Sequence, residues 1–260
     1  MNLNFKEVAV EAARQAGGIH KKYFEGDTQT KEKSSSFDLI TIADTEAEKK
    51  VVELIKKNFP DHNILAEEGK YKKTDSKYCW IVDPLDGTNN FSFGIPMFCV
   101  SIALAKDDRL ILGVVYDVMR DELFLAERGK GAYLNDKKIK VSDADSFDKS
   151  LLITGFYYDR GKDMIDNLEA IKVFFQKRVV GIRRLGAAAL DLCYIASGRA
   201  TGFWEFKLSP WDFAAGKLLI EEAGGKVSDK AGEEVRLEQS YIVASNGKIH
   251  QRIIEVINSL

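Results

Sequence analysis

Short apolar runs separated by polar turns occupy the chain from residue 64 to residue 140, and they constrain the fold more than any other feature. The main runs are Tyr78 to Val82, Phe98 to Ala105, Leu110 to Tyr116 and Leu123 to Glu127. Each run has the length of a strand, and most of the connections are short enough for consecutive strands to run in opposite directions. The sequence therefore predicts a largely antiparallel sheet in this part of the chain.

Two amphipathic helices are expected before this sheet. Apolar residues recur at helical spacing from residue 5 to about Gly26, where the first helix should end. A polar, serine-rich loop is expected from residue 27 to residue 36. In the second helix, Thr45 and Glu48 have the spacing of a capping box, and Pro60 should stop the chain from continuing as a helix.

The second half of the chain alternates between strand-like and helix-like segments. They are Leu151 to Thr154, Ile165 to Phe175, Ala187 to Ala196, Gly202 to Phe206, Pro210 to Ala223 and Tyr241 to Ala244. The polar stretch from residue 142 to residue 148 is the expected domain boundary. We therefore predict an N-terminal α+β domain over residues 1–145 and a C-terminal α/β domain over residues 146–260.

Charge and cysteine content exclude several classes of protein. The 38 Lys and Arg and 40 Asp and Glu give a formal net charge of -2, so no overall charge attracts nucleic acid or an acidic membrane. Cys79, Cys99 and Cys193 are odd in number and lie in apolar sequence, which favours reduced, buried thiols. No apolar run has the length of a membrane span and the N-terminus lacks a signal-peptide pattern, so the expected location is the cytoplasm.

Acidic residues follow the predicted strand that ends at Val82. Asp83 and Asp86 belong to the run Asp-Pro-Leu-Asp-Gly-Thr, in which Pro84 is expected to end the strand and Gly87 to permit a turn. Carboxylates at the C-terminal end of a strand face the crevice where α/β sheets bind ligands. Backbone amides beyond such a turn can bind an anion. A plain surface turn is the alternative interpretation.

Two further acidic motifs lie elsewhere in the chain. Glu67 and Glu68 follow a predicted strand end, and Asp212 lies in the first turn of a predicted helix. Exposed glutamates and an acid that complements the helix dipole are the structural alternatives. Like charges in one cleft repel unless a cation lies between them, and magnesium favours carboxylate, water and phosphate oxygens. Together the motifs indicate a metal and phosphate site.

These motifs closely resemble the signatures of the inositol monophosphatase family. The resemblance is carried by Glu67-Glu68-Gly69, the run from Trp80 to Phe91, Trp211 to Gly216 and Glu221 to Gly225, and it spans nearly the whole chain. It implies an α/β fold of α+β layers, an αβαβα five-layer sandwich of the sugar phosphatase type, usually assembled as a homodimer. It also implies a magnesium-dependent phosphomonoesterase, with most of its metal ligands in the N-terminal domain.

The resemblance assigns roles to individual residues. The implied ligands of two or three magnesium ions are Glu67, Asp83, the Leu85 carbonyl, Asp86 and Asp212. The implied catalytic residues are Asp44, Glu67 and Thr88, of which Asp44 and Thr88 resemble the pair that orients and deprotonates the attacking water. Asp44 could equally be only a helix cap. Gly87 and Thr88 would offer backbone amides to the phosphate.

The resemblance also bears on the substrate, a small phosphorylated polyol or sugar. Its implied contacts are Asp86, Gly87, Thr88, Arg183, Arg184, Gly186, Ala188, Glu205, Lys207 and Asp212. Glu205, Gly186 and Ala188 favour a polyol, whereas Arg183, Arg184 and Lys207 resemble the branch that acts on both inositol monophosphate and fructose 1,6-bisphosphate. The two arginines could instead flank a strand or lie in a dimer interface.

The expected reaction is direct hydrolysis by a metal-activated water, with inositol monophosphate and fructose 1,6-bisphosphate as substrates. A phosphohistidine or cysteine-phosphatase route is disfavoured because neither His20, His62 and His250 nor Cys79 lies in a suitable motif. The loop at Lys33 is expected to close over substrate or metal. The alternatives are a phosphatase of phosphoadenosine phosphate and a regulatory or RNA-associated binding protein on the same fold.

Overall fold

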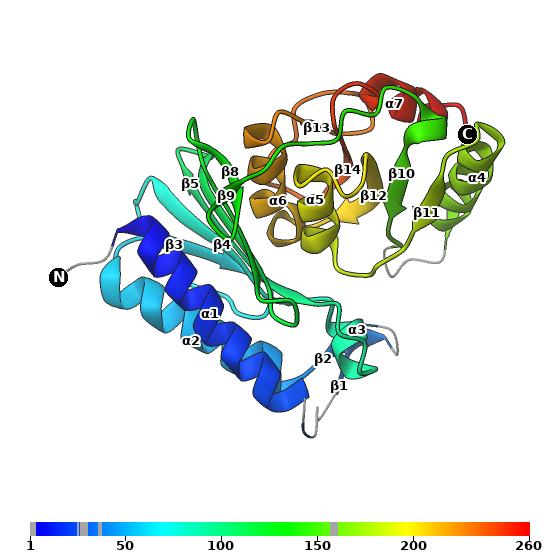
Figure 1. Ribbon diagram of the computed structural model, residues 1–260. Helices are drawn as coiled ribbons and strands as arrows, with labels where there is room; N and C mark the ends of the chain where they lie inside the picture. Colours follow the sequence, from blue (N-terminus) through cyan, green and yellow to red (C-terminus); the bar gives the residue numbers. More distant parts are fainter. Residues whose placement is uncertain (1–3, 25, 27–30, 36–37, 157–160) are drawn as a thin grey trace.

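The computed structural model describes residues 4–24, 26, 31–35, 38–156 and 161–260, and for residues 31–35 and 38–40 the backbone only. Over these residues the chain builds two large sheets and a small two-stranded one. The large sheets stack with helices between them and on their outer faces (Figure 1). No helix in this part of the chain is both long enough and apolar enough to cross a lipid bilayer.

The larger sheet has seven strands in the order β3-β4-β5-β6-β7-β8-β9. The strands are β3 (Asn63–Ala66), β4 (Tyr78–Asp86), β5 (Cys99–Lys106), β6 (Arg109–Asp117), β7 (Glu122–Glu127), β8 (Gly131–Leu134) and β9 (Lys137–Lys138). Strand β3 runs parallel to β4, and the other neighbours pair antiparallel. This pairing confirms the predicted antiparallel sheet.

The second large sheet has five strands in the order β11-β10-β12-β14-β13. The short 3₁₀ helix η1 (Phe147–Lys149) leads into it, and its strands are β10 (Leu151–Thr154), β11 (Gly181–Arg183), β12 (Gly202–Leu208), β13 (Lys226–Ser228) and β14 (Ser240–Ser245). Strand β10 is parallel to both of its neighbours, whereas β14 pairs antiparallel with β12 and β13. The sheet is therefore mixed, as an α/β unit allows.

Helices form the remaining three layers. They are α1 (Phe5–Phe24) and α2 (Ile42–Asn58) on the outer face of the large sheet, α5 (Ala188–Ala196) and α6 (Pro210–Glu222) between the sheets, and α4 (Lys162–Gln176) and α7 (His250–Asn258) on the outer face of the second sheet (Figure 1). The short helix α3 (Thr88–Ser92) follows β4. The predicted five-layer αβαβα sandwich is confirmed.

Strand β4 is buried on both faces of the sheet. Trp80 and Val82 pack into the core beneath α1 and α2, while Ile81 packs into the core that contains α5 and α6. A strand covered on both sides has no polar face, which is why its sequence is a continuous apolar run rather than an alternating one. This burial fixes where the acidic end of β4 emerges.

The end of β4 differs from the prediction. The strand continues through Pro84 to Asp86 instead of ending at Val82, and its pairing with β5 is irregular between Asp83 and Asp86. Proline lacks the backbone N–H of a regular ladder, and the irregularity removes the need for that bond. Asp83 and Asp86 are therefore held by a sheet rather than by a surface turn.

The start of α2 also differs from the prediction. The capping box consists of Thr41 and Asp44: the Asp44 carboxylate accepts from the Thr41 N–H at 2.7 Å. The expected box of Thr45 and Glu48 is wrong, because the same spacing occurs four residues earlier, at Thr41 and Asp44, and the helix uses that first pair. Glu48 instead contacts the chain after β3, as described below.

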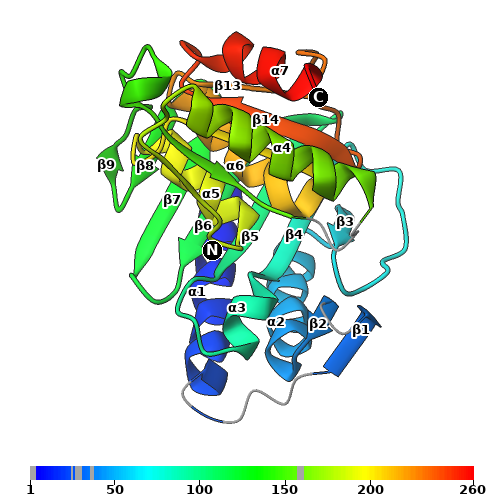
Figure 2. The ribbon, with the colours of Figure 1, turned by 90° about the vertical axis from the view of Figure 1, so that its right-hand side faces the viewer.

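Part of the predicted loop at residues 27–36 forms a short strand, and a second short strand follows the loop. β1 (Lys31–Ser35) pairs antiparallel with β2 (Asp38–Ile40), next to α2 and α3 (Figure 2). Residues 27–30 and 36–37 lie outside the described residues, as do residues 157–160 of the segment after β10. The expected closure of the Lys33 loop therefore stays a prediction.

His250 joins α7 to two strands of the second sheet. Its ring nitrogens lie 2.9 Å from the Ser228 hydroxyl on β13 and 3.0 Å from the Ser245 hydroxyl on β14. Burial, with a smaller contribution from Lys226, lowers the pKa of His250 from 6.5 to about 4. The folded protein thus keeps this ring neutral at a pH where the unfolded chain protonates it.

We predict that His250→Gln makes stability less sensitive to acid. A histidine whose folded pKa is lowered binds fewer protons in the folded state, so its contribution is complete above the unfolded value and is lost as the pH falls toward about 4. The difference between the two proteins should amount to at most a few kcal/mol. Urea unfolding of both proteins across this pH range measures it. If the unfolding free energies of the two proteins changed with pH in parallel, His250 would not be the source of the acid sensitivity.

Candidate active site

A cleft with a volume of about 480 Å³ opens between the two halves of the sandwich. The acidic end of β4 forms one wall, and the starts of α5 and α6 with the end of β12 form the other. Most of the predicted site residues line it, namely Glu67, Asp83, Leu85, Asp86, Gly87, Thr88, Arg184, Gly186, Ala188, Glu205 and Asp212. Residues from widely separated parts of the sequence thus meet in one cavity.

The turn after β4 has a tightly determined backbone. Gly87 has a φ of +94°, and a Cβ atom there would lie 2.9 Å from the Met97 carbonyl oxygen, so only glycine fits. Gly87 is also the N-cap of α3 and has no side chain that could cap the first amides of that helix. These amides lie at the cleft wall and can donate hydrogen bonds to an anion.

Thr88 connects the turn to α2. Its hydroxyl oxygen lies 3.0 Å from Asp44 Oδ1 and 2.9 Å from the Leu85 carbonyl oxygen. Asp44 uses its other carboxylate oxygen to cap α2, so it is both a helix cap and a partner of Thr88. Asp44 is buried beside the cleft rather than in its lining, and burial raises its pKa to about 6 despite the bonds from Thr41.

Asp86 is held from the opposite side of the cleft. Its carboxylate oxygens accept the backbone N–H of Ala188 at 3.1 Å and that of Ala189 at 2.7 Å, at the start of α5. The Cys99 thiol lies 3.6 Å from the same carboxylate. The positive end of a helix therefore fixes this aspartate in both position and orientation.

The remaining acids are also fixed by backbone groups. The Ser209 N–H donates to Asp212 Oδ2 at 2.7 Å at the start of α6. The turn that carries Glu67 is held by Glu48, which accepts from the Glu68 N–H at 2.9 Å and from the Tyr71 hydroxyl at 2.8 Å. A buried carboxylate on α2 thus supports a carboxylate in the cleft.

Burial and, to a smaller extent, neighbouring carboxylates raise the pKa of Asp83, Asp86 and Asp212. Burial is the largest cause for Asp83, and Glu67, Asp86 and Asp212 add repulsion, so its pKa lies well above the usual value. Burial raises the pKa of Asp86 to about 6 even though Ala189 donates to it, and burial together with Glu67 raises that of Asp212. Crowded carboxylates of this kind are typical of a site completed by a cation.

The donor set fits a hard, oxygen-binding cation. The candidate ligands are carboxylates and one carbonyl, with neither histidine nor thiolate among them, and this is the chemistry that magnesium prefers. Among the described residues no three His, Cys, Asp or Glu side chains are already gathered at ligand spacing.

The far end of the cleft carries one acid and one cation. Burial raises the pKa of Glu205 on β12 to about 8, and the nearby Arg184 opposes this shift. Asp191 on α5 is buried close by, with burial and Glu205 raising its pKa, and its Oδ1 has no hydrogen-bond partner among the described residues. This end can bind the hydroxyl groups or an anionic group of a substrate.

Two predicted substrate contacts do not line the cleft. The exposed Arg183 donates to its neighbouring carbonyl, that of Ile182, at 3.2 Å. Lys207 forms an ion pair of 3.1 Å with Asp163 near the start of α4, and it has a φ of +60°. Arg184 is therefore the one of these three cations that the structure places at the cleft.

Sequence reasoning missed several lining residues. They are Asn89, Leu208, Ser209 and Trp211. Ser209 and Trp211 flank Asp212 in the motif that was identified, so proximity in sequence could have indicated them. Leu208 carries no chemical group that would mark it, and only the fold brings it to the cleft.

Comparisons with known proteins agree with this arrangement. The model of the inositol monophosphatase family matches residues 1–260. Inositol-1-monophosphatase of Synechocystis is 44% identical over 252 residues, which cover 96% of this chain and 88% of that protein. Nus factor SuhB of Pseudomonas aeruginosa is 43% identical over 257 residues, covering 96% and 94%. The crystal structure of extragenic suppressor protein SuhB from Bartonella henselae superposes with a TM-score of 0.92 at 39% identity, covering 97% of each chain.

The fold and the cleft define a phosphatase that hydrolyses phosphate monoesters. The full-length match narrows the class of protein further, because the family model, the relatives and the solved structures all point to the same family. The chain belongs to the inositol monophosphatase family.

Proposed function

We propose that this phosphatase depends on magnesium and hydrolyses inositol monophosphate, and that fructose 1,6-bisphosphate is a further substrate. The observation that carries the proposal is the gathering of Glu67, Asp83, Asp86 and Asp212 in one cleft, where each needs a cation to balance its neighbours. A more distant solved structure, an IMPase/NADP phosphatase at 25% identity and a TM-score of 0.84, is described as a complex with Mg2+ and phosphate.

The proposed ligands of two or three magnesium ions are Glu67, Asp83, the Leu85 carbonyl, Asp86 and Asp212. Bound magnesium supplies a Lewis acid that lowers the pKa of water and neutralises the leaving oxygen. Backbone N–H groups of Gly87 and Thr88 bind the phosphate oxygens. Two further features support the site: α5 holds Asp86, and Glu48 holds the turn at Glu67.

Asp44 and Thr88 move the proton of the attacking water. Water gives its proton toward Thr88 Oγ1, and the threonine hydroxyl passes its own proton to Asp44 Oδ1 at 3.0 Å. The pKa of Asp44, raised to about 6 by burial, makes this carboxylate a stronger base than an exposed aspartate. Residues 1–145 supply this chemistry, whereas residues 146–260 supply Asp212 and the substrate contacts Arg184, Gly186, Ala188 and Glu205.

Phosphate release tests the proposal. The purified protein should release phosphate from inositol 1-phosphate when magnesium is present and should lose this activity with a chelator. The rates of phosphate release from fructose 1,6-bisphosphate and phosphoadenosine phosphate, measured alongside, show which of these is a further substrate. Absence of release from inositol 1-phosphate at saturating magnesium would reject the proposed substrate. Assembly as a homodimer and location in the cytoplasm are part of the same proposal.

The two neighbouring arginines offer a matched pair of variants. We predict that Arg184→Ala lowers kcat/KM about tenfold or more, because a hydrogen bond to a charged group contributes about 1.5–3 kcal/mol. Arg183→Ala removes the same charge from a side chain outside the cleft lining and should change kcat/KM by less than about twofold. If Arg184→Ala lowers kcat/KM for fructose 1,6-bisphosphate but not for inositol 1-phosphate, Arg184 binds the second phosphate of the bisphosphate. Equal losses of kcat/KM in Arg183→Ala and Arg184→Ala would contradict the placement of Arg184, and not Arg183, at the cleft.

A further inference from the structure

The side chain of Asn90 joins the two halves of the protein behind the cleft. Asn90 lies in α3 and is 6% exposed. Its Nδ2 atom donates to the carbonyl oxygens of Met97 and Leu185, each at 2.8 Å. A carboxamide has two N–H groups on this nitrogen, so both are used. One acceptor belongs to the first half of the chain and the other to the second.

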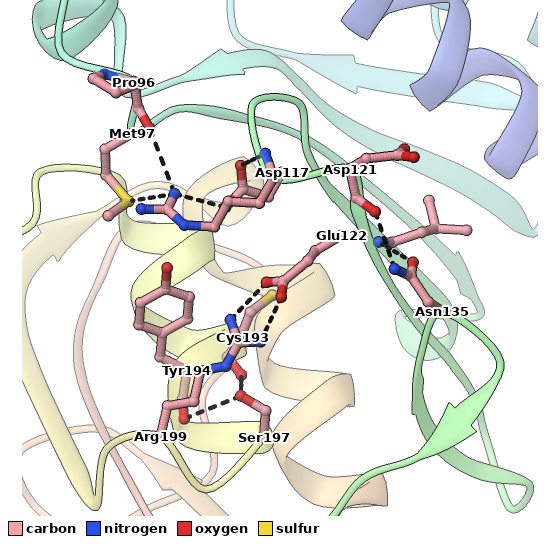
Figure 3. A network of polar contacts seen from close by, with 12 residues as sticks. Pro96, Met97, Asp117, Asp121, Glu122, Asn135, Cys193, Tyr194, Ser197 and Arg199 are labelled. Atoms are coloured by element: carbon pink, nitrogen blue, oxygen red, sulfur yellow. Dashed lines mark hydrogen bonds and ion pairs between the residues drawn. The ribbon is translucent and has the colours of Figure 1, made fainter.

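The Met97 side of this bridge is firmly anchored. Arg120 Nη1 lies 3.4 Å from the Pro96 carbonyl oxygen and 3.8 Å from the Met97 sulfur. Figure 3 labels Pro96 and Met97 in this network. The same guanidinium forms an ion pair of 3.0 Å with the fully buried Asp117. Arg120 and Asp117 thus hold the segment that contains Met97 through charge-assisted contacts, so the Met97 carbonyl is a fixed acceptor for Asn90.

The Leu185 side carries the residues that face the substrate. We define the recognition loop as residues 184–188; it begins with Arg184 in the cleft and ends with Ala188, which donates to Asp86. Gly186 has a φ of +86°, and a Cβ atom there would lie 3.1 Å from Asn90 Nδ2. The loop therefore packs directly on the Asn90 carboxamide. Asn90 supports its middle, and Asp86 holds its end.

We infer that Asn90 is a positioning residue that sets the distance between the recognition loop and the cleft carboxylates, and so determines how strongly a polyol phosphate is preferred over a phosphate ester without hydroxyl groups. The role rests on the proposed function, because it concerns the substrate of the same cleft. Asn90 does not itself line the cleft. It acts through Leu185 on Arg184, and a shift of about 1 Å in such a loop can cost about 100-fold in rate.

The test compares two substrates in two variants. Asn90→Ala removes both donors, and Asn90→Asp keeps the shape of the side chain while facing two carbonyl oxygens with a carboxylate. For inositol 1-phosphate, kcat/KM should fall about 10- to 100-fold, mainly through KM. For p-nitrophenyl phosphate, which offers no hydroxyl groups to Arg184 or Glu205, the change should stay within about threefold. Both substrates are assayed on the same preparation, so the ratio of the two kcat/KM values does not depend on the folded fraction, and the test stays available if a variant folds poorly.

Asn246 provides the control for a purely structural effect. It is 4% exposed, and its Nδ2 donates to the carbonyl oxygens of Ser142 at 3.0 Å and Ala144 at 2.6 Å, away from the cleft. Asn246→Ala breaks the same type of backbone clamp. It should lower the melting temperature to a similar extent, and it should leave the ratio of the two substrates unchanged.

A double variant separates the Asn90 pathway from other effects. If Asn90 acts through the recognition loop, adding Asn90→Ala to Arg184→Ala should lower kcat/KM for inositol 1-phosphate by less than about twofold further. The positioning role would be overturned if the losses of the two single variants multiplied in the double variant. It would also be overturned if an Asn90 variant lost the same factor in kcat/KM on both substrates. A wild-type protein that hydrolyses p-nitrophenyl phosphate but not inositol 1-phosphate would instead overturn the proposed function. The two failures are therefore distinguishable.

Discussion

Asp86→Asn is expected to lower phosphatase activity about 1000-fold while the protein stays folded, because a lost metal ligand removes several kcal/mol of transition-state stabilisation. The N–H groups of Ala188 and Ala189 donate to different oxygens of Asp86 at 3.1 and 2.7 Å, and the substitution keeps an acceptor oxygen for one of them. The recognition loop should therefore remain near its place. Phosphate release over a magnesium titration, with circular dichroism to verify folding, measures the effect.

Glu222→Gln is the matched control for this variant. The Glu222 carboxylate also accepts two backbone N–H groups, from Gly129 at 2.8 Å and Gly131 at 2.9 Å, but it lies on α6 outside the cleft lining. Its loss should affect stability and leave turnover unchanged. Near-normal turnover of Asp86→Asn at saturating magnesium would reject the assignment of Asp86 as a metal ligand.

Magnesium is expected to raise the melting temperature more at about pH 8 than at about pH 5. Burial raises the pKa of Asp86 to about 6 and that of Asp83 well above its usual value. A carboxyl with a raised folded pKa binds more protons in the folded state than in the unfolded state. Without metal, its contribution to stability is therefore lost as the pH rises from about 4 through the folded pKa.

Magnesium replaces the protons that these carboxylates release at high pH. Its stabilising effect should thus be several degrees at the higher pH and clearly smaller at the lower one. Melting curves with magnesium and with a chelator at matched ionic strength provide the measurement, and a sodium salt controls for screening. A shift that is equal at both pH values would show that the ion binds elsewhere than at the buried carboxylates.

The layers of the fold were predictable because periodicity reports burial. The apolar run from Tyr78 to Val82 indicated a strand, and in the structure the two faces of β4 pack into two different cores. Its end was not predictable, because Pro84 normally excludes a strand and only the irregular pairing with β5 admits it. The start of α2 was misplaced because two consecutive capping-box patterns, Thr41 with Asp44 and Thr45 with Glu48, fit this stretch of sequence.

The carboxylates of the cleft were predictable from motifs, but their supports were not. Asp83 and Asp86 lie in a conspicuous run, whereas Asn90 lies just beyond it and gains its importance from a carbonyl 95 residues further along the chain. Arg183 and Arg184 are indistinguishable in sequence. Their separation depends on where β11 ends, since one arginine belongs to the strand and the other follows it.

The helix start that holds Asp86 connects two kinds of binding. Ala188 ends the recognition loop and donates to a proposed metal ligand, so a ligand that moves this end of the loop also moves a carboxylate oxygen of the ion site. Coupling free energies between two sites are reciprocal. If polyol phosphate tightens the affinity for magnesium by some factor, magnesium must tighten the affinity for polyol phosphate by the same factor. The two ligands should therefore stabilise the protein together by more than the sum of their separate effects.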